Sequence, residues 1–122
     1  MPFSYSKLMD ITTLPSSTIA AASAASAIYI NPSSTTTYIA EIEMHNTESL
    51  SASVVLYCVP DNNSNLGIPA ASSEIVKYTM AGYDTIWIEP KYPYILSDQN
   101  EAIFGVATTS SVNIIVRGGR EI

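Results

Sequence analysis

The chain has little of the chemistry on which most enzymes and disulfide-stapled proteins depend. Its 122 residues include one cysteine, one histidine, one tryptophan and five basic side chains. A single cysteine cannot form an intrachain disulfide, which excludes a small disulfide scaffold. Charged residues make up only 13% of the chain, roughly half the usual share, and 28 serines and threonines supply polarity instead. This composition favours a structural or interaction protein and predicts no enzyme, cofactor or catalytic residue.

Positively charged residues are also scarce. Five basic residues face eleven acidic ones, for a net charge of −6. That balance repels phosphate backbones and anionic lipid, so we expect neither a nucleic-acid nor a membrane partner. No apolar run approaches the roughly 18 residues of a membrane span. The start of the chain lacks a basic region followed by a continuous apolar run, so we expect no signal peptide.

The first 27 residues differ from the rest in composition and in periodicity. They show weak periodicity, two prolines and a run of alanine and serine over positions 20–27. Such small side chains offer little to pack, so we expect an extended N-terminal arm over 1–27 or an edge strand. A short helix over 17–26 is the alternative, from alanine propensity. Residues 28–122 then form one domain.

The clearest strand runs from Thr37 to His45, where the residues alternate with period two. Alternation places successive side chains on opposite faces of a strand, so one face should be core and the other solvated. We expect one face to carry Tyr38, Ala40, Ile42 and Met44, and the other to carry Ile39, Glu41, Glu43 and His45.

The remaining strands follow from β-branched and aromatic runs bounded by turn residues. The run 53–59, which contains Cys58 as a core residue, is nearly continuous and should be covered on both faces. We expect 102–108 and 112–117 to form a hairpin across 109–111, with Gly118-Gly119 ending the fold. The other strands are expected at 28–30, 74–80 and 83–89. Seven or eight strands without a convincing helix predict an all-β fold, an antiparallel β-sandwich of jelly-roll type.

Two patterns resemble metal sites. Glu41, Glu43 and His45 project from one strand face at steps of about 7 Å, too far apart to close a metal shell without further ligands. A solvated or partner-facing strand is the better interpretation. The spacing of Asp61, Asn63 and Asn65 resembles the start of a calcium loop, but the required glycine and glutamate are missing. We therefore expect a plain loop and no metal.

The aromatic residues suggest a contact surface. Trp87 lies between two isoleucines, so it points outward if the isoleucines face the core. The alternative is that Trp87 is itself covered by the N-terminal arm or a second sheet. Tyr92 and Tyr94, in a bend bracketed by Pro90 and Pro93, could form the rim of an interface or a sugar-binding face.

Five segments follow a recurring order of strands and turns: 28–32 (IYINP), 42–47 (IEMHNT), 55–60 (VLYCVP), 95–98 (ILSD) and 112–118 (VNIIVRG). In this order the chain resembles a family of small tailed-phage virion proteins.

The resemblance implies a capsid decoration (cement) protein that stabilises the particle by subunit contacts. It would be a homo-oligomer, with a trimer as our expectation, located in the virion after assembly in the host cytoplasm. Its partners would be copies of itself and the major capsid or other virion proteins, with the arm 1–27 reaching over a neighbour. The alternative is a tail or fibre module that binds a host receptor or glycan. The candidate interface residues are Phe3, Tyr5, Glu41, Glu43, Trp87, Tyr92 and Tyr94.

Overall fold

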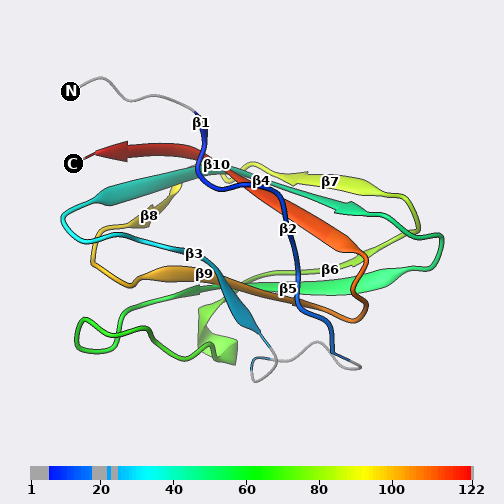
Figure 1. Ribbon diagram of the computed structural model, residues 1–122, viewed down its shortest axis with the longest axis horizontal. Helices are drawn as coiled ribbons and strands as arrows, with labels where there is room; N and C mark the ends of the chain where they lie inside the picture. Colours follow the sequence, from blue (N-terminus) through cyan, green and yellow to red (C-terminus); the bar gives the residue numbers. More distant parts are fainter. Residues whose placement is uncertain (1–5, 18–21, 23–24, 122) are drawn as a thin grey trace.

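Two antiparallel β-sheets pack face to face in this computed structural model, which describes residues 6–17, 22 and 25–121 (Figure 1). The expected all-β sandwich is therefore confirmed. The first sheet contains β1 (Ser6–Lys7), β2 (Thr12–Thr13), β4 (Thr36–Asn46), β7 (Thr85–Ile88), β8 (Tyr94–Leu96) and β10 (Val112–Glu121). The second sheet contains β3 (Ser26–Ile30), β5 (Ala52–Val59), β6 (Glu74–Met80) and β9 (Ala102–Ala107).

The strand order is that of a jelly roll. Strands β1 and β2 both pair with β10, and β7 and β8 both pair with β4, so each couple acts as one interrupted strand. Counting each couple as one strand leaves eight in the described part of the chain, ordered β1/β2–β10–β4–β7/β8 in the first sheet and β3–β9–β5–β6 in the second. Along the chain, the first of these eight pairs with the last, the second with the seventh, the third with the sixth and the fourth with the fifth. A long hairpin rolled into two layers has this pairing.

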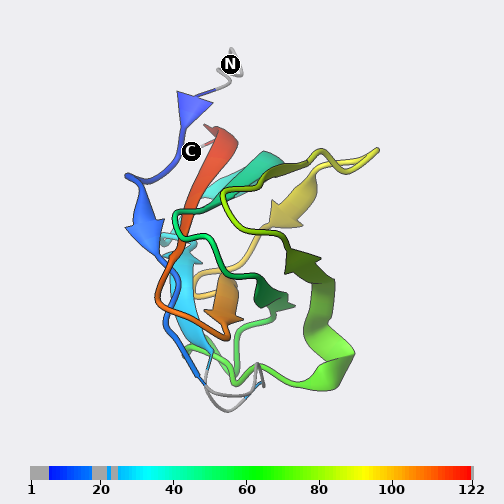
Figure 2. The ribbon, with the colours of Figure 1, turned by 90° about the vertical axis from the view of Figure 1, so that its right-hand side faces the viewer.

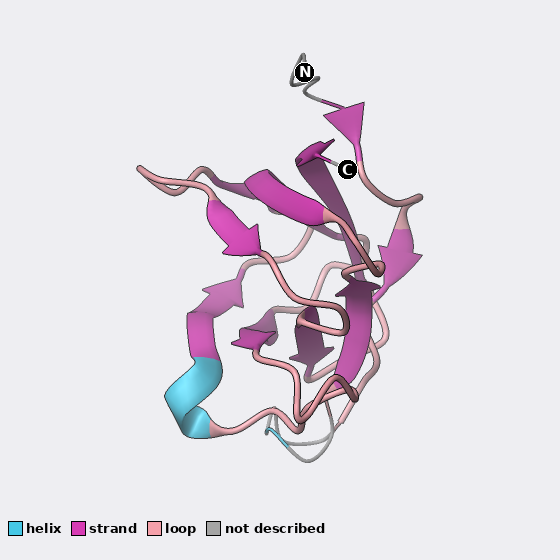
Figure 3. Ribbon diagram, turned by 90° about the vertical axis from the view of Figure 1, so that its left-hand side faces the viewer, coloured by secondary structure: helices cyan, strands magenta, loops and turns pink. Residues whose placement is uncertain are grey.

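All seven strands expected from residues 28–122 are present, and β1 and β2 confirm the edge strand offered as one alternative for the N-terminal segment. The exact positions of three short strands were not predicted. β1, β2 and β8 have only two or three residues each, too few to show a period. Strands supply the body of the described chain, and the helical turn Ala71–Ser73 lies in the loop before β6 (Figure 3). The prolines at 90 and 93 lie between β7 and β8, where an edge strand tolerates the missing donor.

Two expectations for the C-terminal part were wrong. Strands β9 and β10 do not form a hairpin, because β9 pairs with β3 and β5 while β10 pairs with β4 in the other layer. The turn at 109–111 therefore carries the chain from one sheet to the other. Gly118-Gly119 does not end the fold either, since β10 continues through both glycines to Glu121.

A β-bulge in β4 corrects the expected faces of that strand. Glu41 pairs with Arg117 and Ile39 pairs with the next residue of β10, so Ala40 is an extra residue without a partner. One extra residue inverts the alternation on its far side. Ile39 is consequently fully buried, and the half-buried Tyr38 takes the outward face that we had assigned to Ile39.

The described part of the N-terminal segment belongs to the sandwich of its own chain. Leu14 N donates to the carbonyl of Val112 at 2.9 Å, and Ser16 bridges to Ala107 of the second sheet. Leu8 and Leu14 are buried in the core. Figure 2 shows residues 6–17 descending along one flank of the sandwich. This stretch is the first strand of the jelly roll and not a free arm, because its leucines cover an otherwise open edge of the core.

The second sheet is buried on both faces at its centre. Its inner face joins the main core, whereas Val55, Tyr57 and Phe104 on its outer face form a second cluster. Ala22, Ala25 and Ala27 pack against that cluster. The expectation that 53–59 is covered on both faces is thereby confirmed, and small alanine side chains let the backbone approach the sheet closely.

Candidate interaction site on the outer face of the first sheet

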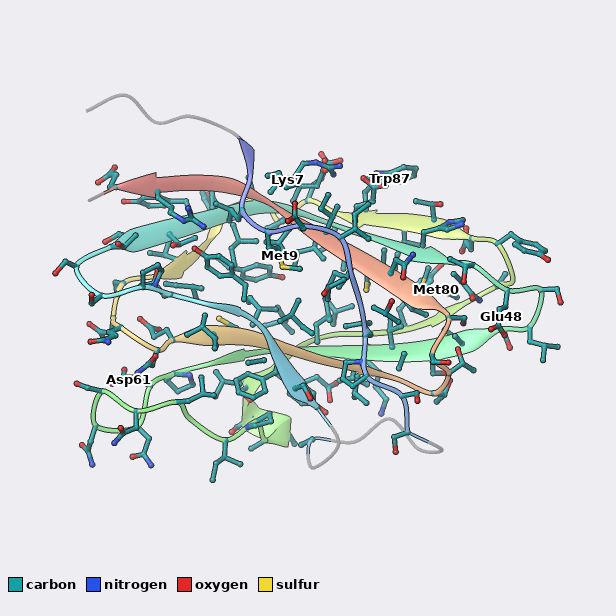
Figure 4. All side chains as sticks on the ribbon, in the orientation of Figure 1. Lys7, Met9, Glu48, Asp61, Met80 and Trp87 are labelled. Carbon is teal, nitrogen blue, oxygen red and sulfur yellow. The ribbon has the colours of Figure 1, made fainter. Side chains whose placement is uncertain are left out.

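The face of the first sheet that points away from the core carries three of the seven predicted interface residues, Glu41, Glu43 and Trp87. Trp87 and Lys7 project from this side in Figure 4. After the bulge in β4, and before Gly118 in β10, alternation turns one set of side chains inward and the other outward. The outward set is Glu41, Glu43 and His45 from β4, and Asn113, Ile115 and Arg117 from β10. Strand pairing arranges them in three parallel rows.

The first row is charged. Arg117 Nη1 donates to Glu41 Oε1 at 2.6 Å and to Glu43 Oε1 at 2.7 Å. Hydrogen bonds to Glu43 and then to Glu41 raise the pKa of Arg117, so the guanidinium stays charged. Lys7 lies opposite Arg117 on β1 and pairs with Asp10 at 2.8 Å. Each carboxylate of this row is thus hydrogen-bonded to a basic side chain of the same chain, with Arg117 shared between two of them.

The second row places an indole beside a carboxylate. Ile115 lies opposite Glu43, and Glu43 lies opposite Trp87 across the β4–β7 pairing. Ile86 and Ile88 pack against the core. Trp87 is 56% exposed, so it points outward and no described part of the chain covers most of it.

The third row is polar. His45 lies between Asn113 and Thr85 in register. Its Nδ1 is 2.7 Å from Thr85 Oγ1. On the other side, Thr13 Oγ1 donates to Asn113 Oδ1 at 2.9 Å. These side chains are held by their neighbours along the row.

A hollow of about 240 Å³ opens between the second and third rows. Ile11, in the link between β1 and β2, stands beside it and is 66% exposed. The hollow is lined by both isoleucine residues and polar residues. Its lining residues are Ile11, Glu43, His45, Asn113, Ile114 and Ile115.

The two patterns that resemble metal sites have other roles. In the described ranges, no group of three or more His, Cys, Asp or Glu side chains gathers as a metal site would require. The two glutamates of β4 hold Arg117 instead. In the other pattern, Asp61 Oδ2 accepts from the backbone N–H of Ser64, and Asn62 pairs with Asn65. That segment is a hydrogen-bonded turn.

The structure brings only some of the predicted interface residues together. Glu41, Glu43 and Trp87 share the outer face. Tyr92 is 75% exposed in the link between β7 and β8, with Lys91 Nζ 5.6 Å from its ring centre. Tyr94 packs partly against the core, and this burial raises its pKa. Phe3 and Tyr5 lie outside the described residues.

Sequence reasoning missed the contributions of β10 and of the β1–β2 link. Arg117, Asn113 and Ile115 alternate with buried residues along 112–117, so their outward orientation was readable from the period. Their position opposite β4 was not, because pairing between distant strands leaves no local signal. Ile11 gave no signal at all, since it lies in a short link.

Comparison with other proteins adds no relative. No protein-family model matches the sequence, and no curated protein is detectably similar to it. Among residues 6–17, 22 and 25–121, no helix has the length and apolar character needed to cross a bilayer.

Proposed function

We propose that the protein is a non-enzymatic structural protein of a bacteriophage virion. In this proposal it is a capsid decoration (cement) protein, assembled in the host cytoplasm, that stabilises the particle through subunit contacts. It associates with copies of itself, as a trimer, and with the major capsid or other virion proteins. The observation that carries the proposal is the outer face of the first sheet, where an exposed Trp87 stands beside charges already paired within the chain.

Paired charges suit a surface that another protein covers. Burying an isolated carboxylate costs several kcal/mol, whereas a carboxylate that is already hydrogen-bonded to a guanidinium keeps its partner on burial. Glu41 and Glu43 are in that state, with Arg117 between them. The exposed indole supplies the large apolar contact that commonly anchors protein interfaces. This face can therefore be covered without leaving a charge unpaired.

The fold supports the same proposal at a coarser level. Jelly rolls recur in viral capsid domains, although they also occur in lectins, so the topology alone does not decide the function. Low charge agrees with a subunit that covers much of its surface with neighbours. Many weak contacts repeated over a particle can add to a large stabilisation.

The test adds purified protein to phage particles assembled without it, and measures copy number and resistance to heat. We expect saturation at hundreds of copies per particle and a higher temperature of particle disruption. Trp87→Ala should weaken particle binding and self-association, whereas Tyr78→Ala, on the second sheet and 46% exposed, should not. A monomer that leaves particle stability unchanged would overturn the proposal. Binding to host cells at tens of copies would instead favour a tail or fibre module.

A further inference from the structure

The hollow between the second and third rows has the chemistry of a small binding site. We propose that it binds one neutral pyranose ring of a polysaccharide. The inference goes beyond the structural role proposed above, and it concerns the outer face of the first sheet while no other protein covers it. It rests on the polar side-chain atoms around the hollow that can hydrogen-bond to a ligand.

Each of three polar side chains around the hollow makes a hydrogen bond within the sheet through one polar atom. Each has a second polar atom that makes no hydrogen bond to the described residues. Asn113 Oδ1 accepts from Thr13, which leaves its amide NH₂ as a donor. Glu43 accepts from Arg117 through Oε1, which leaves Oε2 as an acceptor.

His45 is held in the same way. It contacts Thr85 through Nδ1, which leaves Nε2 as donor or acceptor according to the tautomer. All three side chains line the hollow.

Strand geometry sets the spacing of these groups. His45 and Asn113 are directly opposite in register, which places their Cβ atoms about 5 Å apart. Glu43 is two residues along β4 from His45, a step of about 7 Å. Neighbouring hydroxyls of a sugar ring each donate and accept, so they can satisfy a donor, an acceptor and an imidazole nitrogen over such distances.

A sugar ring also has an apolar face of C–H groups, which the apolar residues of the hollow can contact. Ile115 and Ile11 supply apolar surface at its sides. Trp87 stands across β4 from Ile115, on the far side of Glu43. At about 240 Å³ the hollow is smaller than the roughly 300 Å³ at which pockets for drug-sized ligands begin, so it suits a single ring.

Charge favours a neutral ligand over an ionic one. Arg117 already donates to Glu43 as well as to Glu41, so a cationic ligand at Glu43 would compete with a bound guanidinium. An acidic sugar would meet the remaining carboxylate oxygen and a chain of net charge −6. Neutral hydroxyls meet neither obstacle.

The experiment titrates the ¹⁵N-labelled full chain with a panel of neutral methyl hexopyranosides. Glucuronic acid and glycerol are run at matched concentrations. We expect saturable shifts, for at least one neutral sugar, in the Asn113 side-chain amide and the Ile115 backbone amide. Glucuronic acid and glycerol should give weaker, non-saturating changes. If no neutral pyranoside produces saturable shifts at these residues, or if glycerol matches the best sugar, the inference is wrong.

One substitution separates binding from folding. Asn113→Asp keeps the oxygen that accepts from Thr13 and removes the donor facing the hollow, so we expect sugar affinity to fall about tenfold or more. Asn63→Asp makes the same change of charge in an exposed turn and should leave affinity unchanged. Equal affinity in Asn113→Asp and wild type would overturn the assigned site. Sugar and particle binding should also be measured on Trp87→Ala, which leaves Glu43, His45 and Asn113 in place. Particle binding lost with sugar affinity retained in Trp87→Ala would distinguish the structural role from the sugar site.

Discussion

Gly118 lies against the backbone of Tyr38 so closely that a Cβ built on the glycine would come within 1.8 Å of the Tyr38 carbonyl oxygen. The contact occurs at the bulge, where Ala40 is looped out between the residues that pair with Arg117 and Gly118. Backbone atoms of two paired strands cannot retreat as a flexible side chain can. The glycine is therefore required by close approach of the two central strands of the first sheet.

Gly118→Ala should lower the free energy of unfolding by about 3 kcal/mol, at the upper end of typical overpacking. Urea denaturation measures the change. Gly105→Ala is the matched control, because a Cβ there meets the side-chain ends of Leu14 and Leu56 at 2.7 and 2.8 Å. Those methyl groups can move, so we expect about 1 kcal/mol. Equal losses at the two glycines would contradict the role given to the bulge.

Asn46 ties three loops to the end of β4 from a fully buried position. Asn46→Ala should destabilise the protein by about 3 kcal/mol, because four hydrogen bonds made from a buried side chain are lost at once. Its amide donates to the carbonyls of Leu50 and Ala81, and its Oδ1 accepts from Glu48 N and Ser111 Oγ.

Thermal and urea unfolding of Asn46→Ala should be compared with Gln99→Ala, which removes an exposed amide. The control should stay within about 0.5 kcal/mol of wild type. An Asn46→Ala protein as stable as the control would show that the three loops do not need the hydrogen bonds of Asn46.

Arg117→Met should cost about 1 kcal/mol, the upper end for partly exposed ion pairs, because it leaves two carboxylates side by side. Double-mutant cycles with Glu41→Gln and Glu43→Gln should give a favourable coupling for each pair. Lys7→Met is the control, since Lys7 and Asp10 are 52% and 92% exposed and should couple by almost nothing. If Arg117 couples to neither glutamate, the charges of this face are not compensated as we describe.

Cys58 should make stability depend on alkaline pH. Burial, and then the charge of Glu101, raises the pKa of its thiol above the ordinary value of 9.0. The unfolded chain therefore ionises first, so the thiol's contribution is intact below pH 9.0 and is lost as the pH rises through the raised folded value. Cys58→Ala should flatten this decline relative to wild type in urea titrations.

The reactivity of the same thiol offers an independent measurement. Iodoacetamide should alkylate Cys58 far more slowly in the folded protein than in urea at the same pH, because the thiolate is the reactive form. Equal rates would show that the sulfur is accessible and normally ionised in the folded state.

Much of the fold was readable because strand character is local. The alternation of 37–45 and the apolar run 53–59 predicted two central strands, and the isoleucines around Trp87 predicted an outward indole. The bulge at Ala40 was not readable, because it arises from the partner strand, 77 positions away at Arg117. The same holds for Arg117 itself, whose two carboxylate partners come from β4.

The amino-acid sequence by itself determined where the seven longer strands lie, which side chains face solvent where the alternation is unbroken, and that the surface carries little charge. These properties follow from the two-residue period and from composition, both of which act over a few neighbouring residues. Tertiary structure alone decided that residues 6–17 complete the first sheet, that β9 and β10 belong to different layers, and that Glu43, His45 and Asn113 surround one hollow. Strand pairing joins residues far apart in the chain, and its register is set by how both faces pack.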